Sequence, residues 1–353
     1  MVLIIKKFII MLLCLSLFCS LSATAFADGP ATSARCAVLM SGDGQIIYAK
    51  NADQRALIAS TTKLMTAIVA IEQLDLSTTV EIKSEWCGIE GSSMYLKPGD
   101  ELSVEDLLYG LLLVSGNDAA VALACITAGD IEGFAVLMNQ KAEELEMTDS
   151  SFENPHGLDS DKHYSSAADM AKLMAYCMDN PHFARLIGTF SHEVGVQTLV
   201  NHNKLLQSCP GCTGGKTGYT KAAGRCLVSC CERDDTRLIC VTLSAPDDWN
   251  DHVNLYKWGF DNYCSRDAAE GIEFSVPVVS GDVKAVSVTP AEEIRVFCRK
   301  DDTLHAVAEL PHFVFAPVEK GQPAGKLSII LDGKFVGECP LVYAEDAAQL
   351  DIA

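Results

Sequence analysis

The sequence predicts an α+β domain, built from an antiparallel sheet and a cluster of helices, followed by a small all-β domain. Strand-like segments at 36–48 and 227–244 lie on either side of a region that is rich in apolar helical segments. In such an arrangement the first and last strands share one sheet. From about Gly271 onward, only short strand-like runs occur. A chain of 353 residues is long enough for one large domain or two, so its length allows this division.

The N-terminal segment has the layout of a secretory signal peptide. Lys6 and Lys7 precede an apolar stretch from Phe8 to about Leu21, and an Ala-x-Ala cleavage site lies at 25–27. The stretch is short for a membrane span, and an uncleaved N-terminal anchor is the alternative. We therefore expect export through a signal peptide to the extracellular or cell-wall side of the cytoplasmic membrane.

The mature chain begins with a predicted hairpin and a predicted buried helix. Cys36–Met40 and Gln45–Tyr48 are apolar runs of strand length, and the turn residues Ser41–Gly44 separate them. This pattern is typical of a β-hairpin. Between Thr61 and Leu74 nearly every residue is apolar, and many are small. Such a composition predicts a helix that is buried on most of its surface.

Two further helices and a second hairpin are predicted downstream. Ser103–Leu113 begins like a capping box and continues as an apolar helix, and Asp118–Ala128 is the next helical segment. Leu227–Arg233 and Arg237–Ser244 are rich in β-forming residues and surround the polar turn at 234–236. We expect these strands to share a sheet with the N-terminal hairpin.

The C-terminal region contains short strands separated by turns. Asp332-Gly333 is a strong tight-turn signal between two of them. Near 266–271 the sequence pattern changes to short strand-like runs only. The predicted division is therefore a signal peptide at 1–27, an α+β domain at 28–268 and a β-rich domain at 269–353. The predicted strands of the last domain are Phe274–Val278, Val283–Val288, Ile294–Cys298, Lys326–Leu331 and Phe335–Val336.

The composition is acidic and argues against a nucleic-acid partner. The chain has 47 Asp and Glu against 27 Lys and Arg, a formal charge of −20. Too few cations are available to neutralise phosphates. The eight histidines include no His-Glu-x-x-His motif, and His156 with His163 is a poor metal-binding pair. We therefore expect neither a metal nor another cofactor.

The first motif with chemical meaning is Ser60-Thr-Thr-Lys63, which opens the predicted buried helix. A spacing of three residues places the hydroxyl and the amine on one helical face within contact distance. Serine is a weak nucleophile until a neighbour takes its proton, and a lysine can do so when burial and adjacent positive charge lower its pKa. Taken alone, the motif is weak evidence for catalysis, because a surface Ser with a Lys one helical turn later is ordinary.

A second motif, Ser115-Gly-Asn117, lies in the predicted loop between two apolar helices. From such a loop a hydroxyl and an amide can project into a cleft. The alternative is a simple connection in which Asn117 or Asp118 caps the next helix.

A third motif, Lys216-Thr-Gly218, precedes the strand that starts at Leu227. Lys216 offers positive charge, Thr217 offers a hydroxyl for a carboxylate, and Gly218 leaves room for a substrate beside the strand. The alternative is a basic turn in which glycine supplies the backbone conformation.

The combination is far more specific than its parts, because each motif occurs once and in this order. Such a set is typical of class A β-lactamases and penicillin-binding proteins. The chain resembles the low-molecular-weight penicillin-binding proteins that are serine-type D-alanyl-D-alanine carboxypeptidases of peptidase family S11. The resemblance covers roughly residues 30 to 345, including the family's C-terminal associated domain. It is carried by Ala59–Thr66, Leu113–Ala119, Phe152–Leu158 and Gly215–Thr220.

This resemblance implies a serine β-lactamase/penicillin-binding-protein-like catalytic domain at 28–268 and a role for each motif residue. Ser60 would attack the carbonyl between the two terminal D-alanines of a peptidoglycan stem peptide and release D-alanine. Lys63 would be the general base, Ser115 would relay a proton to the leaving amine, and Asn117 would hold the substrate and Lys63.

The resemblance also implies how the substrate binds. Lys216 and Thr217 would bind the terminal carboxylate, and the backbone N–H groups of Ser60 and of a residue after Gly218 would form the oxyanion hole. Water then hydrolyses the acyl-enzyme. β-Lactam antibiotics imitate the chain end, so we expect them to acylate Ser60 as covalent inhibitors, and we expect the enzyme to regulate cell-wall crosslinking.

Two rival functions and one structural question stay open at this point. A class A-like β-lactamase deacylates with a glutamate on a separate loop, but the sequence contains no Glu-x-x-x-Asn element, and Gly116 departs from the Ser-Asp-Asn form of the second motif. A non-catalytic penicillin-recognising sensor is the other rival. The family often ends in an amphipathic membrane-anchoring helix, which we do not find before 351–353, so membrane association is left open.

The cysteines allow three interpretations. Loss of the signal peptide removes two of the 15 and leaves 13. Cys209-Pro-Gly-Cys212, followed by Cys226, Cys230 and Cys231, superficially resembles a zinc ribbon, and a Cys209–Cys212 or similar disulfide is a second interpretation. We favour free thiols that pack as small apolar side chains in strands, as suits an organism that lives without oxygen.

Overall fold

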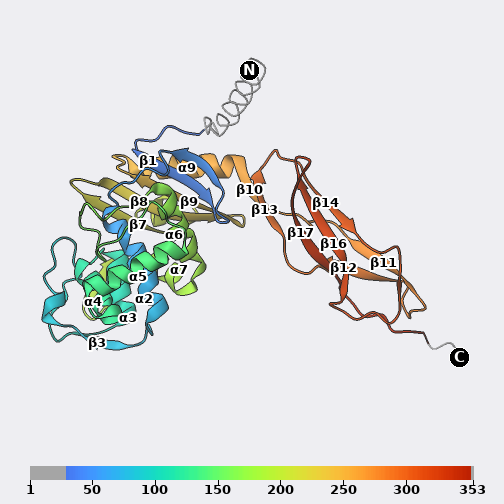
Figure 1. Ribbon diagram of the computed structural model, residues 1–353, viewed down its shortest axis with the longest axis horizontal. Helices are drawn as coiled ribbons and strands as arrows, with labels where there is room; N and C mark the ends of the chain where they lie inside the picture. Colours follow the sequence, from blue (N-terminus) through green and yellow to red (C-terminus); the bar gives the residue numbers. More distant parts are fainter. Residues whose placement is uncertain (1–28, 351–353) are drawn as a thin grey trace, which may run out of the picture.

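The computed structural model describes residues 29–350, which form an α+β part and an all-β part (Figure 1). The β part extends away from the α+β part, so the molecule is elongated. This architecture confirms the predicted fold class. The predicted signal peptide at 1–27 lies outside the described residues.

The α+β part is built on one antiparallel sheet of five strands in the order β2-β1-β9-β8-β7. The N-terminal strand β1 therefore lies inside the sheet, where Val38 pairs with Val241 of β9. Both predicted hairpins are confirmed, and they share this sheet as expected. The strands are β1 (Cys36–Ser41), β2 (Ile46–Lys50), β7 (Cys212–Thr220), β8 (Gly224–Arg233) and β9 (Thr236–Leu243).

Helices cover both faces of this sheet because its side chains are apolar in both directions. Alternate residues of one strand enter different cores, as Cys230 packs toward the helical cluster and Cys231 toward α9. The long helix α9 covers one face together with Leu205 of the short α8, and the other helices form the cluster on the opposite face. The helices are α2 (Lys63–Gln73), α3 (Val104–Leu113), α4 (Asn117–Ala128), α5 (Ile131–Glu144), α6 (Ala167–Asp179), α7 (Pro181–Gly188), α8 (Leu205–Ser208) and α9 (Asp248–Asn262), with short 3₁₀ turns η1 (Ala59–Thr62) and η2 (Ser84–Trp86).

The three predicted helices are confirmed as α2, α3 and α4, with small shifts at their starts. In α3 the Ser103 hydroxyl accepts a hydrogen bond from the Asp106 N–H, as the capping-box pattern indicates. Helix α2 is buried along its first nine residues, from Lys63 to Ile71. Two short hairpins complete the domain, and their strands are β3 (Thr79–Glu81), β4 (Glu101–Ser103), β5 (Ser191–Val194) and β6 (Gln197–Val200).

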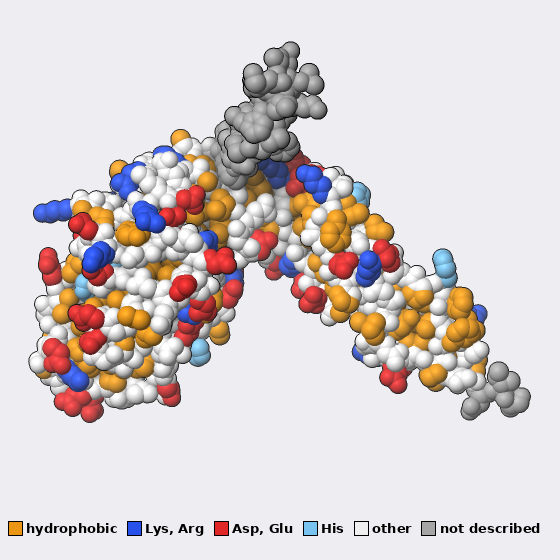
Figure 2. All heavy atoms as spheres, viewed as in Figure 1, with side chains coloured by type: hydrophobic (Ala, Val, Ile, Leu, Met, Phe, Trp, Pro, Cys, Tyr) orange, Lys and Arg blue, Asp and Glu red, His pale blue; other side chains and the backbone are white. Residues whose placement is uncertain are grey.

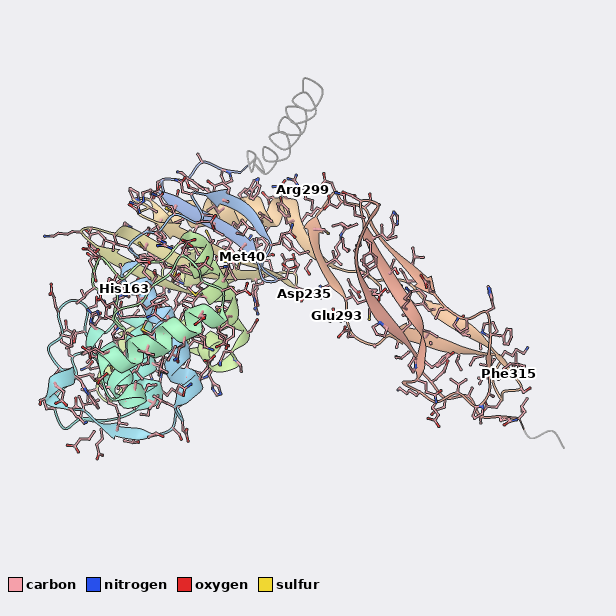
Figure 3. All side chains as sticks on the ribbon, viewed as in Figure 1. Met40, His163, Asp235, Glu293, Arg299 and Phe315 are labelled. Carbon is pink, nitrogen blue, oxygen red and sulfur yellow. The ribbon has the colours of Figure 1, made fainter. Side chains whose placement is uncertain are left out.

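The C-terminal part contains a sheet of six strands in the order β14-β16-β17-β12-β11-β15. The predicted turn at Asp332-Gly333 is confirmed, since both residues have positive φ and Leu331 pairs with Lys334 across it. Phe315 of β15 lies at the far end of this sheet (Figure 3). The strands are β11 (Phe274–Val279), β12 (Ala285–Pro290), β14 (Leu304–Glu309), β15 (Val314–Phe315), β16 (Pro323–Leu331) and β17 (Lys334–Tyr343).

One strand departs from the expected arrangement. The predicted strand near 294–298 is β13 (Arg295–Arg299), and it pairs with β10 (Tyr263–Asp267) rather than with the C-terminal sheet. The two-stranded unit therefore crosses the predicted boundary at 268, which itself stays a prediction. At this junction the Arg295 guanidinium pairs with Asp235 at 3.0 Å and with Glu293 at 2.8 Å, and Figure 3 labels these two acidic residues.

Acidic and basic side chains are interspersed over the visible face of both parts (Figure 2). Within residues 29–350 no single helix is long and apolar enough to cross a membrane. Only α4 and α5 together reach that length and composition, and they are bent by 84° where they meet.

Candidate active site

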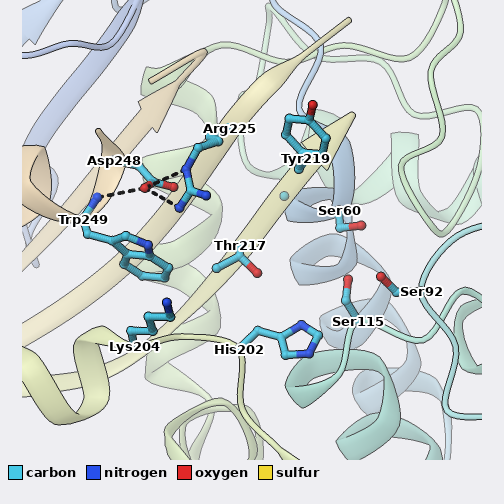
Figure 4. Close-up of a pocket in the computed structure, with 11 residues that line it drawn as sticks. Ser60, Ser92, Ser115, His202, Lys204, Thr217, Tyr219, Arg225, Asp248 and Trp249 are labelled. Carbon is cyan, nitrogen blue, oxygen red and sulfur yellow. Dashed lines mark hydrogen bonds and ion pairs between the residues drawn. The ribbon is translucent and has the colours of Figure 1, made fainter. Parts of the chain in front are cut away.

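A polar cleft of about 340 Å³ lies where the helical cluster meets the edge strand β7 (Figure 4). Ser60, Ser92 and Ser115 lie together at one end of the cleft. Thr217 and His202 lie between these serines and a charged group at the other end. The full lining consists of Ser60, Ser92, Ser115, His202, Lys204, Thr217, Gly218, Tyr219, Arg225, Asp248 and Trp249.

Ser60 lies in the tight turn η1, directly before α2. The turn is held by two side-chain bonds to its own backbone, from Thr61 Oγ1 to the Ile58 carbonyl at 2.6 Å and from Thr62 Oγ1 to the Ala59 carbonyl at 2.8 Å. Ala59 adopts a positive φ of 47°, a conformation that costs free energy for a residue other than glycine. The turn presents the half-buried Ser60 hydroxyl to the cleft.

Lys63 is fully buried beneath this serine and contacts three oxygen atoms. Its Nζ lies 3.0 Å from Ser60 Oγ, 2.6 Å from Asn117 Oδ1 and 2.7 Å from the carbonyl oxygen of His156. The amide and carbonyl oxygens can only accept hydrogen bonds. In the neutral amine they take both N–H groups, and the lone pair is then directed to the Ser60 hydroxyl. The geometry therefore suits a base that removes the proton from Ser60.

The surroundings of Lys63 favour its neutral form. Burial, and next the positive charge of Lys216, hold the pKa of the Lys63 amine well below its ordinary value, while the negative charge of Asp118 opposes the shift. Burial and an adjacent positive charge, the two conditions expected for a lysine that acts as a base, are therefore both present.

Asn117 is held on its far side by backbone groups. Its Nδ2 donates to the Glu90 carbonyl at 2.5 Å, so Oδ1 faces Lys63, and the backbone N–H of Asn117 donates to the Ser92 carbonyl at 2.7 Å. Asn117 is the first residue of α4, and Gly116 occupies the cap position without a side-chain bond. The alternative of a capping Asn117 or Asp118 is therefore wrong.

Ser115 occupies the connection between α3 and α4, as predicted, and has a positive φ of 63°. Its side chain lines the cleft on the same side as Ser60 (Figure 4). Ser115 is only 4% exposed, so a substrate bound in the cleft would shield its hydroxyl from solvent.

The turn Asn154–Gly157 supplies the third oxygen around Lys63 and packs against η1. Gly157 has a φ of +89°, and a Cβ at this position would lie 1.9 Å from the Ala59 carbonyl oxygen. Asn154 Oδ1 accepts from the Gly157 N–H at 2.7 Å and closes the turn. The backbone of this turn thus determines where the His156 carbonyl meets Lys63.

We expect Gly157→Ala to slow acylation of Ser60 about tenfold and to lower the free energy of unfolding by about 2 kcal/mol. The added methyl group must displace either the turn or Ala59, and both hold the catalytic pair. Penicillin labelling rates and urea denaturation would measure the two effects.

Gly99→Ala is the matched control for Gly157→Ala. Gly99 has a similar φ of +85°, but nothing lies within 4 Å of its Cβ position. It should therefore show only the backbone cost, with an unchanged labelling rate. Equal labelling rates for the two variants would contradict the role assigned to the turn.

Lys216, Thr217 and Gly218 lie on the edge strand β7, close to the nucleophile. A Cβ on Gly218 would lie 3.0 Å from the backbone nitrogen of Ser60, so the close approach of strand and turn requires glycine. Lys216 is buried, and its Nζ donates to the Thr217 carbonyl at 2.9 Å. Burial lowers the pKa of Lys216 to about 7, so its positive charge depends on pH.

The charged end of the cleft was not predicted from the sequence. Arg225 Nε and Nη2 both donate to Asp248 Oδ1, at 3.0 and 2.7 Å, and the guanidinium lies beside the ring of Trp249 (Figure 4). His202 and Lys204 come from the segment before α8. The residues of this charged end come from separate elements, so no short sequence motif contains them. The only sequence signal was that basic residues occur shortly before and after Lys216.

All seven candidate residues converge in the structure. Four of them line the cleft, and Lys63, Asn117 and Lys216 lie buried behind it. Their individual catalytic roles stay predictions. Among residues 29–350 no group of His, Cys, Asp and Glu side chains is arranged to hold a metal ion.

Comparison with known proteins extends over almost the whole chain. The family model described as D-alanyl-D-alanine carboxypeptidase matches residues 23–247, and the model of the penicillin-binding protein 5 C-terminal domain matches 269–349. The D-alanyl-D-alanine carboxypeptidase DacF of Bacillus subtilis is 34% identical over 349 residues, covering 92% of this chain and 90% of the relative. DacC of Escherichia coli, also named a D-alanyl-D-alanine carboxypeptidase, is 33% identical and covers 92% of this chain and 88% of its own length.

Solved structures show the same relationship. Penicillin binding protein 5 from Haemophilus influenzae aligns with a TM-score of 0.71 and 31% identity, over 92% of this chain and all of that one. Penicillin binding protein 6B from Escherichia coli aligns with a TM-score of 0.72 and 29% identity, over 90% of this chain and 98% of that one. The resemblance indicated by the motifs is confirmed, and the chain belongs to the D-alanyl-D-alanine carboxypeptidase family, peptidase family S11.

Proposed function

We propose that this protein is a serine-type D-alanyl-D-alanine carboxypeptidase that removes the terminal D-alanine from peptidoglycan stem pentapeptides. The observation that carries the proposal is the buried Lys63 amine, held by Asn117 and His156 with its third contact on Ser60 Oγ. Family membership supports the same activity, because the curated relatives carry that name.

The reaction begins when Ser60 Oγ attacks the carbonyl carbon of the bond between the two D-alanines. Lys63 accepts the hydroxyl proton, and the carbonyl oxygen gains negative charge. We expect the backbone N–H groups of Ser60 and Tyr219 to stabilise that charge, because β7 packs against the Ser60 nitrogen at Gly218. Ser115 passes its proton to the leaving amine and regains one from Lys63, and breaking the C–N bond releases D-alanine. A water molecule then hydrolyses the ester and restores Ser60.

The basic side chains of the cleft suit a substrate that ends in a carboxylate. Thr217 offers a hydroxyl beside Lys216, and Lys204 and Arg225 place further positive charge beyond it. Arg225 is already paired with Asp248, so Thr217 and the lysines are the groups available to the terminal carboxylate. The same contacts would hold the carboxylate of a β-lactam, which would acylate Ser60.

A single pair of assays tests the activity. The mature protein is incubated with diacetyl-Lys-D-Ala-D-Ala and, separately, with a fluorescent penicillin. Release of D-alanine together with a long-lived covalent label supports the proposal. Rapid penicillin turnover would indicate a β-lactamase instead, and labelling without D-alanine release would indicate a sensor.

The two lysines predict how activity depends on pH. Lys63 becomes a base as pH rises through its lowered pKa, so the acylation rate should rise and reach its plateau well below the ordinary lysine value of about 10. Lys216 loses its charge as pH rises through about 7, so the KM for an anionic peptide should increase above that pH. Measuring kcat and KM from about pH 5 to about pH 10 separates the two effects.

A peptide with a C-terminal amide provides the control for Lys216. It lacks the carboxylate, so its KM should not depend on the charge of Lys216, although its kcat should still follow Lys63. A parallel rise of KM for both peptides above pH 7 would contradict the assignment of Lys216 to the carboxylate.

We also propose that the protein acts outside the cytoplasmic membrane, on the side where peptidoglycan lies. The layout of residues 1–27 supports this location. N-terminal sequencing of protein isolated from cells should begin at Asp28. Recovery of the full-length chain from the cytosolic fraction would contradict export.

A further inference from the structure

Three cysteines of the motif region form a thiol cluster beside the N-terminal end of β7. Cys209 and Cys231 place their sulfur atoms 3.7 Å apart. Cys212, the first residue of β7, pairs with Cys231 across the β7–β8 ladder. We call Cys209, Cys212 and Cys231 the thiol cluster. All thirteen cysteines among the described residues have free thiols, and the Cys209–Cys212 disulfide considered from the sequence is absent from them.

Backbone contacts hold Cys209 against β8. The turn 209–212 is closed by a bond from the Cys212 N–H to the Cys209 carbonyl at 3.1 Å. It is fastened to β8 by the Glu232 N–H, which donates to the Gly211 carbonyl at 2.8 Å. Gly211 has a φ of +81°, and a Cβ there would lie 2.5 Å from the Glu232 carbonyl oxygen. The distance between the two sulfur atoms is therefore set by the fold.

A cation adjoins one thiol of the cluster. Arg233 Nη2 lies 3.8 Å from Cys209 Sγ, while its Nε donates to the Pro210 carbonyl at 2.9 Å and its guanidinium lies over the ring of Phe260. A bond from Cys231, and then the charge of Arg233, lower the pKa of the Cys209 thiol to about 7 against the opposing effect of burial. Cys209, beside the Arg233 guanidinium, is thus suited to supply a nucleophilic thiolate.

We propose that Cys209 and Cys231 form a disulfide when the protein meets a peroxide, and that this bond slows the reaction of Ser60. The Cys209 thiolate attacks one peroxide oxygen and breaks the O–O bond, giving a sulfenic acid and hydroxide. The Cys231 thiol then attacks the Cys209 sulfur, which forms the S–S bond and releases water. Two thiols are oxidised and one hydrogen peroxide is reduced to two waters. Cys209 is 4% exposed and lies between exposed residues, so a small oxidant can reach it.

The bond would act on the active site through β7. A disulfide requires about 2.0 Å between the sulfur atoms. The turn 209–212 and β8 must therefore approach each other, because the two sulfur atoms are now 3.7 Å apart. Strand β7 has little room to absorb this movement, because Cβ positions on Gly214 and Gly215 would lie 2.6 and 2.8 Å from Ile187 and Asn203 side-chain atoms. The displacement therefore reaches Lys216 and Gly218, and Gly218 packs directly against the Ser60 turn.

The test uses the mature protein treated with hydrogen peroxide and then with iodoacetamide under denaturing conditions. Peptide mass mapping should find Cys209 linked to Cys231 and both protected from alkylation. Penicillin labelling of Ser60 should be slowed about tenfold in the oxidised protein and restored by dithiothreitol. No Cys209–Cys231 link, or an unchanged labelling rate when the link has formed, would overturn the proposal.

Two variants and one control distinguish this bond from general oxidation. Cys209→Ser and Cys231→Ala should both keep their labelling rate in peroxide. Cys230→Ala removes the adjacent buried thiol, which faces the other core, and should respond like the natural protein. Slowing that persists in the Cys231→Ala variant would also overturn the proposal. The measurement of labelling rate rests on the proposed function, whereas the peptide map of the disulfide does not. If penicillin never labels the reduced protein, the proposed function is refuted and the disulfide proposal is still tested by the map.

Discussion

Ser60→Ala should abolish the covalent penicillin label and lower the rate of D-alanine release by about 10⁶-fold. Without the hydroxyl no acyl-enzyme can form, and the cleft has only its binding groups left. The fold should remain intact, because the Ser60 side chain makes one hydrogen bond, to Lys63 Nζ. Intact-protein mass spectrometry after incubation with penicillin measures the label, and a D-alanine assay measures turnover.

Ser92→Ala is the matched control for this result. It removes a hydroxyl from the same cleft, at a residue outside the contacts of Lys63. Labelling should persist there within a fewfold of the natural rate. If Ser60→Ala retained the label, or Ser92→Ala lost it, the assignment of Ser60 as the nucleophile would be contradicted.

Lys63→Arg should slow acylation by about 10³-fold or more. Arginine keeps the positive charge and can donate to Asn117 and to the His156 carbonyl, but its pKa is too high for it to lose a proton. The variant therefore separates a base from a fixed cation. Single-turnover labelling with penicillin, followed across pH, is the measurement, and the pH-dependent rise of the natural protein should disappear.

Lys63→Gln gives the complementary comparison. Glutamine is neutral and keeps a polar terminus, yet it is not a base, so it should be as slow as the arginine variant. If arginine supported acylation within tenfold of lysine while glutamine did not, Lys63 would serve as a cation and the assigned base would be wrong. Thermal unfolding of both variants shows whether loss of activity reflects loss of fold.

The parts of the site that the sequence predicted are those that local spacing or side-chain identity encodes. Ser60 and Lys63 are three residues apart, so any helical turn brings them together. The contacts that complete the site are long-range and made by backbone. The carbonyls of His156 and Glu90 hold the amine and the amide, 93 and 27 residues from their partners. A carbonyl group leaves no sign in the sequence of what it will contact.

The same distinction explains the fold. Turn residues and apolar runs predicted both hairpins of the main sheet, because each is specified by neighbouring residues. Helix α5 was not predicted, although its buried residues Phe134, Met138 and Ala142 have the i, i+4, i+8 spacing that is typical of an amphipathic helix. Strand β13 was assigned to the wrong sheet because its apolar pattern is satisfied equally by β10, and pattern alone does not name a partner.

The position of β1 inside the sheet has a consequence for how the protein matures. Its partner β9 lies about 200 residues later in the chain, and closing so long a loop is slow. The sheet cannot be completed until residue 243 has left the ribosome and, for an exported chain, the translocation channel. Until then the helical cluster has no platform, and Ser60 and β7 are not in place. The ability to react with penicillin is therefore acquired in one late step, and the time at which the covalent label first forms measures when the sheet is completed.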